Sequence, residues 1–149
     1  MKAVVQRVMS ANLKVDGKLI SEIGRGFVVF LGVGEGDSEE DLSKLMGKIS
    51  KLRIFEDENG KMNLSIKQVE GEILLVSQFT LYGDCTHGNR PSFIKAEKPE
   101  RANELYMQGK VILENEDIPV KTGVFGADMK IDALNDGPVT IIMDSKDLK

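Results

Sequence analysis

The chain has 149 residues, of which 41% are hydrophobic and 30% charged, and its net charge is −4. This composition predicts one globular domain over residues 1–149, and the negative charge argues against a protein that coats nucleic acid non-specifically. It does not exclude contact with the end of an RNA. The single cysteine, Cys85, excludes an internal disulfide. A reducing cytoplasm is expected, because neither a signal-peptide pattern nor an 18-residue apolar run occurs.

The first half of the chain alternates between strand and helix patterns. Residues 1–23 predict a strand and a hairpin whose turn lies at Asp16-Gly17, and the continuous apolar run 26–34 predicts a strand buried on both faces. Residues 38–52 predict a helix, with Ser38 as its N-cap and acidic residues in its first turn. Its apolar face follows helical spacing: Leu42, Leu45, Met46, Ile49 and Leu52.

The second half of the chain also alternates between strand and helix patterns. Asn59-Gly60 predicts a tight turn, and residues 72–83 (EILLVSQFTLYG) have the strongest strand pattern in the chain. An irregular loop follows at 83–93, and Pro99 marks the first turn of a second helix. Alternating apolar residues predict two further strands, around 129–133 and 139–143. The whole pattern indicates a mixed α/β domain with helices over one face of the β-structure.

The usual catalytic and metal-binding residues are scarce. His87 is the only histidine, and it lies in a polar loop without the pattern of a nucleophile elbow. Cys85 has no imidazole near it in sequence except His87, and these two residues alone do not make a metal site. The glycines at 32, 34 and 36 are not followed by the Lys-Ser/Thr of a phosphate loop. The sequence therefore predicts neither a metal nor a cofactor.

Three other segments have both a structural and a functional interpretation. SQFT (77–80) is either the ordinary alternation of a strand or a strand end with polar groups, an aromatic ring and backbone N–H donors for an oxyanion. VFGADM (124–129) is either a glycine-containing bulge or a place where a flat ligand approaches the backbone. Gly137-Pro138 is either a turn or a peptide shaped for a ligand, since X-Pro is where a cis bond costs least.

These segments together resemble one family. SQFTLYG, NDGPVT, the start MKAVVQRV and the stretch TGVFGADM look like those of the D-aminoacyl-tRNA deacylases, also called D-tyrosyl-tRNA(Tyr) deacylases. The resemblance covers essentially the whole chain, and both signatures, SQFT and NxGPVT, are intact. HGNRPSF (87–93) resembles a family loop GxRPSF in a less basic version. The resemblance implies β-sheets packed face to face in a barrel-like arrangement, with two main helices on one side in β/β/α layers.

The family's activity would be hydrolysis of the ester between a D-amino acid, or glycine, and the terminal ribose of tRNA. The resemblance implies a homodimer in which a Gly-cisPro peptide of one subunit enters the active site of the other and rejects L-amino acids. Gly137 and Pro138, followed by Val139, match this motif. Arg7 matches the residue that holds the Gly-Pro loop in place.

By the same matching, SQFT forms the other wall of the site. Ser77, Gln78 and Phe79 would lie near the ester, whose carbonyl the backbone N–H groups polarise. Thr80 is a nucleophile by residue type, but no base in the sequence is clearly available to activate it. The resemblance implies that the terminal ribose 2′-hydroxyl, or a water that it orients, acts instead while the protein positions the ester. A further group would receive the terminal adenine. Its members are Phe125, Gly126, Ala127 and Met129.

Two alternatives remain open. The first is a non-catalytic module that binds an adenine nucleotide or an RNA end in the 125–129 segment, although such a module needs no intact SQFT and GPVT. The second is a small esterase that uses Thr80 or Ser77 on any ester. Arg90 and Lys95 are either contacts to phosphates of the acceptor stem or ordinary surface charges.

Overall fold

The computed structural model covers residues 1–149. It begins with the predicted hairpin: β1 (Lys2–Val15) and β2 (Lys18–Ile23) pair in antiparallel register. Asp16 and Gly17 both have positive φ, 50° and 76°, as a two-residue turn between twisted strands requires. β3 (Gly26–Gly32) then pairs antiparallel with the first half of β1.

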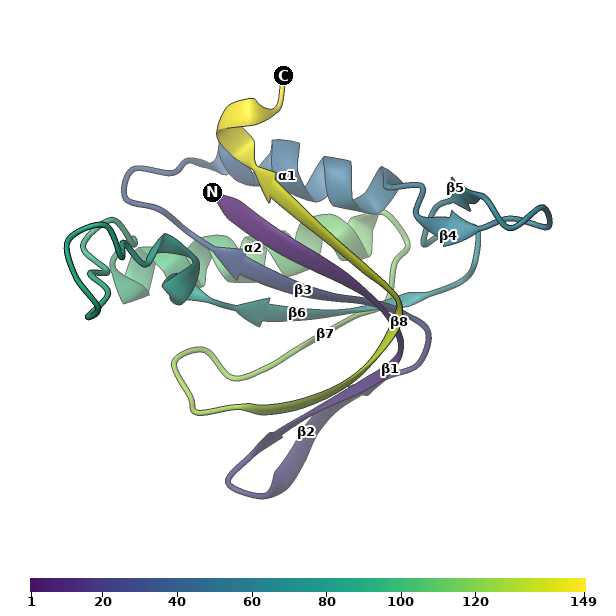
Figure 1. The fold of residues 1–149 in the computed structure, drawn as a ribbon, viewed down its shortest axis with the longest axis horizontal. Helices are drawn as coiled ribbons and strands as arrows, with labels where there is room; N and C mark the ends of the chain where they lie inside the picture. Colours follow the sequence, from purple (N-terminus) through teal and green to yellow (C-terminus); the bar gives the residue numbers. More distant parts are fainter.

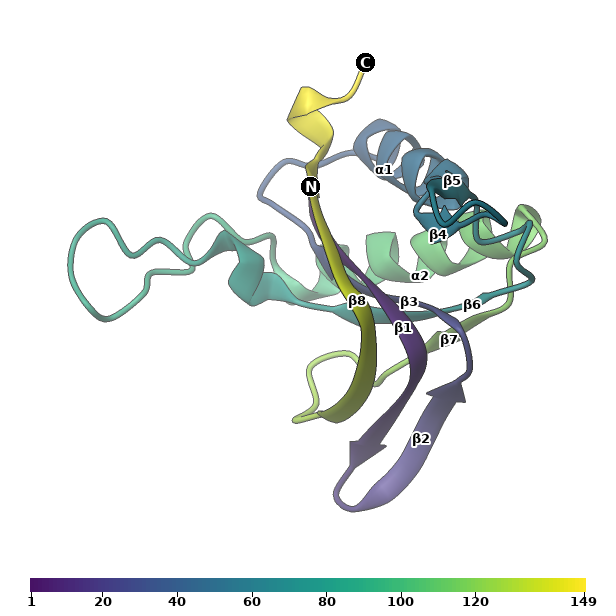
Figure 2. The ribbon, with the colours of Figure 1, turned by 45° about the vertical axis from the view of Figure 1, so that its right-hand side comes forward.

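The main sheet has six strands in the order β2-β1-β3-β6-β7, with β8 on the other edge of β1. β6 (Glu72–Ser77) and β7 (Val120–Thr122) extend it in parallel, and β8 (Lys130–Asp144) runs antiparallel to β1. The sheet is strongly bent, as Figures 1 and 2 show. Lys121 Nζ of β7 donates to the main-chain oxygen of Glu22 in β2 at 2.8 Å. The result is the expected barrel-like sheet, nearly closed.

Two helices cover one outer side of this sheet (Figure 1). α1 (Glu39–Lys51) begins at a capping box in which Ser38 and Asp41 satisfy each other's backbone N–H. α2 (Pro99–Asn115) has proline in its first turn, where a missing N–H costs nothing. Arg101 bonds Glu39 at 2.9 Å, so the two helices begin side by side. Both predicted helices and the α/β class are confirmed, and no helix is long and apolar enough to cross a membrane.

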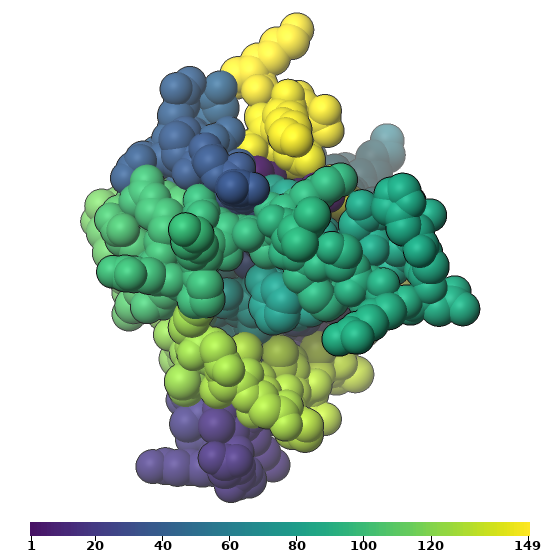
Figure 3. Space-filling view, turned by 90° about the vertical axis from the view of Figure 1, so that its left-hand side faces the viewer, coloured from purple at the N-terminus to yellow at the C-terminus, as the bar shows by residue number.

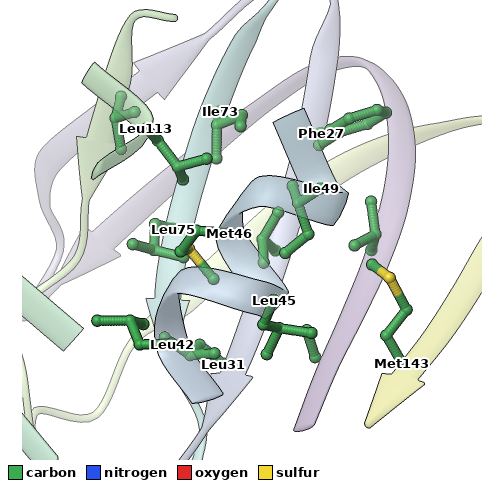
Figure 4. Close-up of a cluster of buried hydrophobic side chains, with 14 of the residues drawn as sticks. Phe27, Leu31, Leu42, Leu45, Met46, Ile49, Ile73, Leu75, Leu113 and Met143 are labelled. Carbon is green, nitrogen blue, oxygen red and sulfur yellow. The ribbon is translucent and has the colours of Figure 1, made fainter. Parts of the chain in front are cut away.

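The bent sheet separates two hydrophobic clusters. The larger contains 23 buried residues between the helices and the sheet, and Figure 4 shows Leu42, Leu45 and Met46 of α1 packed there. The smaller contains 7 buried residues on the inner side of the bend. Phe27 of β3 faces the larger cluster and Val28 the smaller. This explains why β3 is a continuous apolar run, as a strand buried on both faces requires.

Two strand predictions are wrong in extent. The strand expected over 72–83 ends at Ser77, and residues Phe79–Tyr82 form a turn of 3₁₀-helix, η1. The neighbouring β3 ends at Gly32, so beyond the bond from Gln78 N to Leu31 O no partner remains to continue the ladder. The two strands expected near the C-terminus are one strand, β8. Its pairing with β1 shifts register near Gly137-Pro138, where proline lacks a donor.

A small hairpin stands apart from the main sheet. β4 (Phe55–Glu56) pairs with β5 (Met62–Leu64), and Gly60 has φ 73° in the predicted turn between them. In Figures 1 and 2 this hairpin lies beside the C-terminal end of α1, while the loop of residues 83–98 projects at the opposite end of the molecule.

Candidate active site

A pocket of about 620 Å³ opens where β6 ends. Five segments line it: Val33 after β3, the end of β6 with the start of η1, residues within 93–99, Ala102 of α2, and the segment 125–131 before and within β8. Eleven of its 18 lining residues are hydrophobic, so the pocket suits a flat, largely apolar group with a few polar contacts. In Figure 3 the teal, green and yellow-green segments that form it lie side by side on one face.

The pocket brings together residues from two of the predicted motifs. Ser77, Gln78 and Phe79 line it from the end of β6. The 125–129 segment lines it from the other side with four of the predicted residues: Phe125, Gly126, Ala127 and Met129. The two motifs meet because β6 and β7 are parallel neighbours, so the chain leaves both strands at the same edge of the sheet.

Thr80 does not line the pocket. Its side chain is exposed, and its hydroxyl oxygen accepts a hydrogen bond from Gln78 Nε2. The charged residues of the lining are Glu97, Lys98 and Asp128, and none of them bonds this hydroxyl. His87 is exposed on the projecting loop and is not in the lining. The arrangement therefore gives Thr80 no base that would turn it into a nucleophile.

Aromatic contacts fix the two walls of the pocket. The Phe79 and Phe93 rings meet edge to face at 5.2 Å between centroids, and Phe79 remains 54% exposed. Behind the opposite wall, Phe125 lies 6.1 Å from the ring of Tyr106. The Tyr106 hydroxyl donates to the main-chain oxygen of Leu75 at 2.6 Å, and burial raises the pKa of Tyr106 to about 12. Tyr106 thus remains neutral and supports Phe125 from the core.

Sequence reasoning missed the contribution of the loop before α2. Phe93, Ile94 and Glu97 line the pocket, although the loop was predicted only as an irregular, weakly basic segment. Pairing of Asp84 with Ser92 closes the loop tip, and Glu97 N donates to Val33 O at 2.9 Å to anchor its base. The phenylalanine of RPSF was the only available signal, because an aromatic residue in a polar loop needs a place to pack.

The charged residues of this loop have local partners. The backbone N–H groups of Lys98 and Gly36 lower the pKa of Glu97, which keeps its carboxylate ionised at the pocket rim. Lys95 bonds Asp84 at 3.7 Å, and the pKa of Asp84 is lowered first by the Thr86 hydroxyl. Arg90 is exposed and lies outside the lining.

The Gly137-Pro138 peptide is cis, and it lies on β8 outside the pocket of its own chain. Both residues are exposed, and the partly buried Val139 that follows is also absent from the lining. Gly137 has φ 123°, and a Cβ there would lie 3.1 Å from Arg7 Nη2, so only glycine fits without strain.

Arg7 holds this peptide from behind. It is 4% exposed, and its Nη1 donates to Ile54 O at 2.7 Å while its Nε donates to Asp136 O at 3.2 Å. The Asp136 carboxylate lies 3.4 Å from the same Nε. The chain thus presents a firmly held Gly-Pro peptide to solvent, separate from the pocket that holds the other predicted residues. Groups of three or more His, Cys, Asp or Glu that could bind a metal are absent.

Comparison with known proteins agrees with this fold and shows the family. The family model described as D-Tyr-tRNA(Tyr) deacylase matches residues 4–144. The chain is 60% identical over 148 residues to the D-aminoacyl-tRNA deacylase of Persephonella marina, covering 99% of this chain and 100% of that protein. It is 53% identical over 149 residues to the D-aminoacyl-tRNA deacylase of Dictyoglomus turgidum, covering 100% and 96% of the two chains.

Two solved structures are similar as well. The c-Myc DNA unwinding element binding protein superimposes with a TM-score of 0.89 at 44% identity, covering 97% of this chain and 98% of that one. A probable eukaryotic D-amino acid tRNA deacylase superimposes with a TM-score of 0.81 at 19% identity over 96% and 98% of the chains, which shows the shared fold. The chain therefore belongs to the D-Tyr-tRNA(Tyr) deacylase family, a family of hydrolases.

Proposed function

We propose that this protein hydrolyses the ester that joins a D-amino acid, or glycine, to the terminal ribose of tRNA. Water adds across the ester, the amino acid leaves as a carboxylate, and the ribose regains its hydroxyl. The observation that carries this proposal is the single pocket of about 620 Å³ that SQFT and the 125–129 segment share. Its volume suits an adenosine with an amino acid attached.

The adenine end of the substrate belongs against the 125–129 wall. Phe125 supplies an aromatic ring supported by Tyr106, and Met129 supplies a polarisable thioether. Gly126 and Ala127 between them carry little or no side chain, so a flat base can approach the backbone there. This binding mode needs no broad basic surface, which agrees with the net charge of −4.

The ester carbonyl belongs at the end of β6. Phe79 and Thr80 begin η1, and the first N–H groups of a helical turn have no acceptor within it, so they are free to polarise a carbonyl oxygen. Ser77 and Gln78 line the pocket beside them. Because Thr80 has no base, we assign the attack to water assisted by the terminal ribose 2′-hydroxyl.

Selection of the D-enantiomer belongs to Gly137-Pro138 of a second subunit. The peptide is exposed, cis and held by Arg7, and it does not line the pocket of its own chain. In a homodimer its carbonyl oxygens would face the α-amino group of the substrate in the partner's pocket. An L side chain would then point into the backbone, whereas a D side chain or the hydrogen of glycine would not. The cytoplasm, where charged tRNA is used, is the expected compartment.

The first test is deacylation of matched D- and L-tyrosyl-tRNA by the purified protein and by Pro138→Ala, with Pro91→Ala in the exposed loop as the control. Release of D-tyrosine alone, reduced in Pro138→Ala but unchanged in Pro91→Ala, supports the whole proposal. Release of both enantiomers by the unaltered protein keeps the hydrolase and overturns the chiral selector. Release of neither by folded protein leaves a module that only binds the RNA end.

The catalytic group is tested separately. A substrate that ends in 2′-deoxyadenosine should react far more slowly, whereas Thr80→Val should retain most of the activity. The opposite pattern would make Thr80 the nucleophile and the protein a general esterase. Size-exclusion chromatography with light scattering tests the dimer directly.

A further inference from the structure

A group of basic residues at the end of α1 has no part in the site described above. It consists of Lys48, Lys51, Arg53 and Lys67, here called the α1-end patch. All four side chains are exposed, and none forms an ion pair with a carboxylate of the protein. In a chain with a net charge of −4, four unpaired cations in one place are a local exception that calls for an anionic partner.

The patch is hollowed rather than flat. Lys51 and Arg53 line two adjoining depressions of about 390 and 400 Å³, with Lys67 in the first and Lys48 in the second. The first also contains hydroxyl and amide side chains, and its only carboxylate is Glu116. The second contains no carboxylate. Basic side chains together with neutral hydroxyl and amide side chains are the groups that contact backbone phosphates in nucleic-acid complexes.

One member of the patch is already oriented. Arg53 donates from Nε to Asn63 O at 2.9 Å and from Nη2 to the Asn63 side-chain oxygen, so β5 fixes the plane of its guanidinium. The remaining N–H groups can bind a phosphate in two places at once. The preference of a helix C-terminus for cations accounts for Lys48 and Lys51, but not for Arg53 and Lys67, which lie beyond the helix.

The patch lies far from the pocket of its own chain. The two helices start side by side at the pocket end, and α2 has 17 residues, about 25 Å at 1.5 Å per residue. Glu116, at the end of α2, lines the patch, whereas Pro99, at its start, lines the pocket. An RNA end bound in the pocket therefore does not reach the patch of the same chain without crossing the length of α2.

The patch lies close to the Gly-Pro peptide of its own chain. Arg7 joins the two, because it donates to Ile54, the residue after Arg53, and to Asp136, the residue before Gly137. Under the proposed function, Gly137-Pro138 enters the partner's pocket. The α1-end patch of one subunit would then lie beside the opening of the other subunit's site.

We propose that the α1-end patch binds backbone phosphates of the tRNA acceptor stem whose 3′ end occupies the pocket of the partner subunit. The position of the RNA end rests on the proposed function, whereas binding of phosphates by the patch does not. Each subunit thereby contributes both the chiral selector and an RNA-binding surface to the other subunit's site. A monomer would lack both.

The binding test uses uncharged tRNA and two double variants of equal charge. Lys51→Glu with Lys67→Glu reverses the patch, and Lys18→Glu with Lys146→Glu makes the same change of net charge on exposed lysines elsewhere. The patch variant should bind about tenfold more weakly or worse, and the slope of log affinity against log salt should fall by about 1.4 to 1.8. The control should bind within about twofold of the unaltered protein. Equal weakening in both variants, or none in the patch variant, overturns the proposal.

Thermal unfolding of both variants separates loss of binding from loss of fold. If the patch variant unfolds early, Lys67→Glu alone, in the turn after β5, replaces it and should give a smaller loss of the same kind. A minimal ester, D-tyrosyl-adenosine, has no stem phosphates, so the patch variant should hydrolyse it at the normal rate. If the unaltered protein hydrolyses neither this ester nor D-tyrosyl-tRNA, the proposed function is overturned. The tRNA-binding measurement then still shows whether the patch binds phosphates.

Mixed dimers test which subunit the patch serves. Ala127→Trp blocks the pocket of one subunit but leaves its patch intact. The other subunit carries the patch substitutions but keeps an open pocket. In this mixed dimer, the one open pocket therefore lies beside the intact patch of its partner. We expect this mixed dimer to regain about half of the normal rate on D-tyrosyl-tRNA, while both parent variants stay slow. No recovery would show that each patch serves the pocket of its own chain and would overturn the cross-subunit proposal.

Discussion

Arg7 and Asp136 are 129 residues apart in sequence, yet the Arg7 Nε donates to the main-chain oxygen of Asp136 at 3.2 Å. This bond ties the central strand β1 to the residue that precedes Gly137-Pro138. The second Arg7 bond, 2.7 Å from Nη1 to Ile54 O, ties the same side chain to the segment after α1. One buried guanidinium thus connects the Gly-Pro peptide, the core strand and the α1-end patch.

Replacement of Arg7 should lower the stability of the fold. Arg7→Met leaves the main-chain oxygens of Asp136 and Ile54 without their donor and removes the ion pair with the Asp136 carboxylate, so we expect a loss of about 2 to 4 kcal/mol in the free energy of unfolding. Arg7→Lys should recover only part, because an ammonium cannot reach both oxygens in the same plane. Urea denaturation measures this. Glu56→Gln is the control, since that exposed carboxylate lies 4.0 Å away, and an equal loss there would contradict the assignment.

Phe79 should matter for activity far more than for stability. The side chain is 54% exposed, so Phe79→Ala should change the free energy of unfolding by no more than about 1 kcal/mol. Under the proposed function, loss of this aromatic wall of the pocket should lower kcat/KM on D-tyrosyl-tRNA at least about tenfold. Met62→Ala removes a side chain that is 58% exposed outside the pocket and serves as the matched control. A variant Phe79→Ala with normal kcat/KM would remove Phe79 from the site.

Asp37 should be essential for stability at the amino-terminal end of β1. The buried ammonium of Met1 lies 2.7 Å from Asp37 Oδ2, which also accepts from Gly34 N at 2.7 Å. Asp37→Asn leaves a buried charge with only a distant carboxylate, Asp144 at 4.0 Å, so we expect a loss of about 2 to 4 kcal/mol. Chemical denaturation measures it. A loss no larger than that of Asp147→Asn, on the exposed C-terminal turn, would contradict this role.

Asp41 should contribute stability that depends on pH. The backbone N–H of Ser38 is the main cause that lowers the pKa of Asp41 below its usual 3.8. Because the folded-state pKa is the lower one, this contribution is complete above the usual pKa and is lost as the pH falls through the folded value.

The substitution Asp41→Asn keeps an acceptor for Ser38 but removes the charge. At pH 7 it should lower the melting temperature by roughly 2 °C, and the difference should shrink as the pH falls below the usual pKa of 3.8. Thermal melts from pH 2 to pH 7 measure this. A difference that persists unchanged at pH 2 would show that the charge is not its source.

The sequence predicted most elements because their signals are local. Asp16-Gly17 needs only positive φ, and Ser38 with the acids after it needs only the first turn of a helix. The predicted end of β6 was wrong because a strand stops where its neighbour stops. The neighbour, β3, ends at Gly32, and the pairing of β3 with β6 is known only from the tertiary structure. The fusion of two predicted strands into β8 has the same origin, because β1 alone is long enough to pair with both parts.

For the candidate site, the sequence by itself determined the motifs, the lack of a triad and, through resemblance, the family. The tertiary structure decided which of these residues share a pocket. It joined SQFT to the 125–129 segment, added Phe93 and Glu97, and left Thr80 and Gly137-Pro138 outside. The physical reason is that a motif records residue type and local backbone preference, whereas a pocket depends on where strands end and which side chains pack across them. The α1-end patch has no sequence motif because Lys67 joins Lys51 and Arg53 in one depression only in the folded chain.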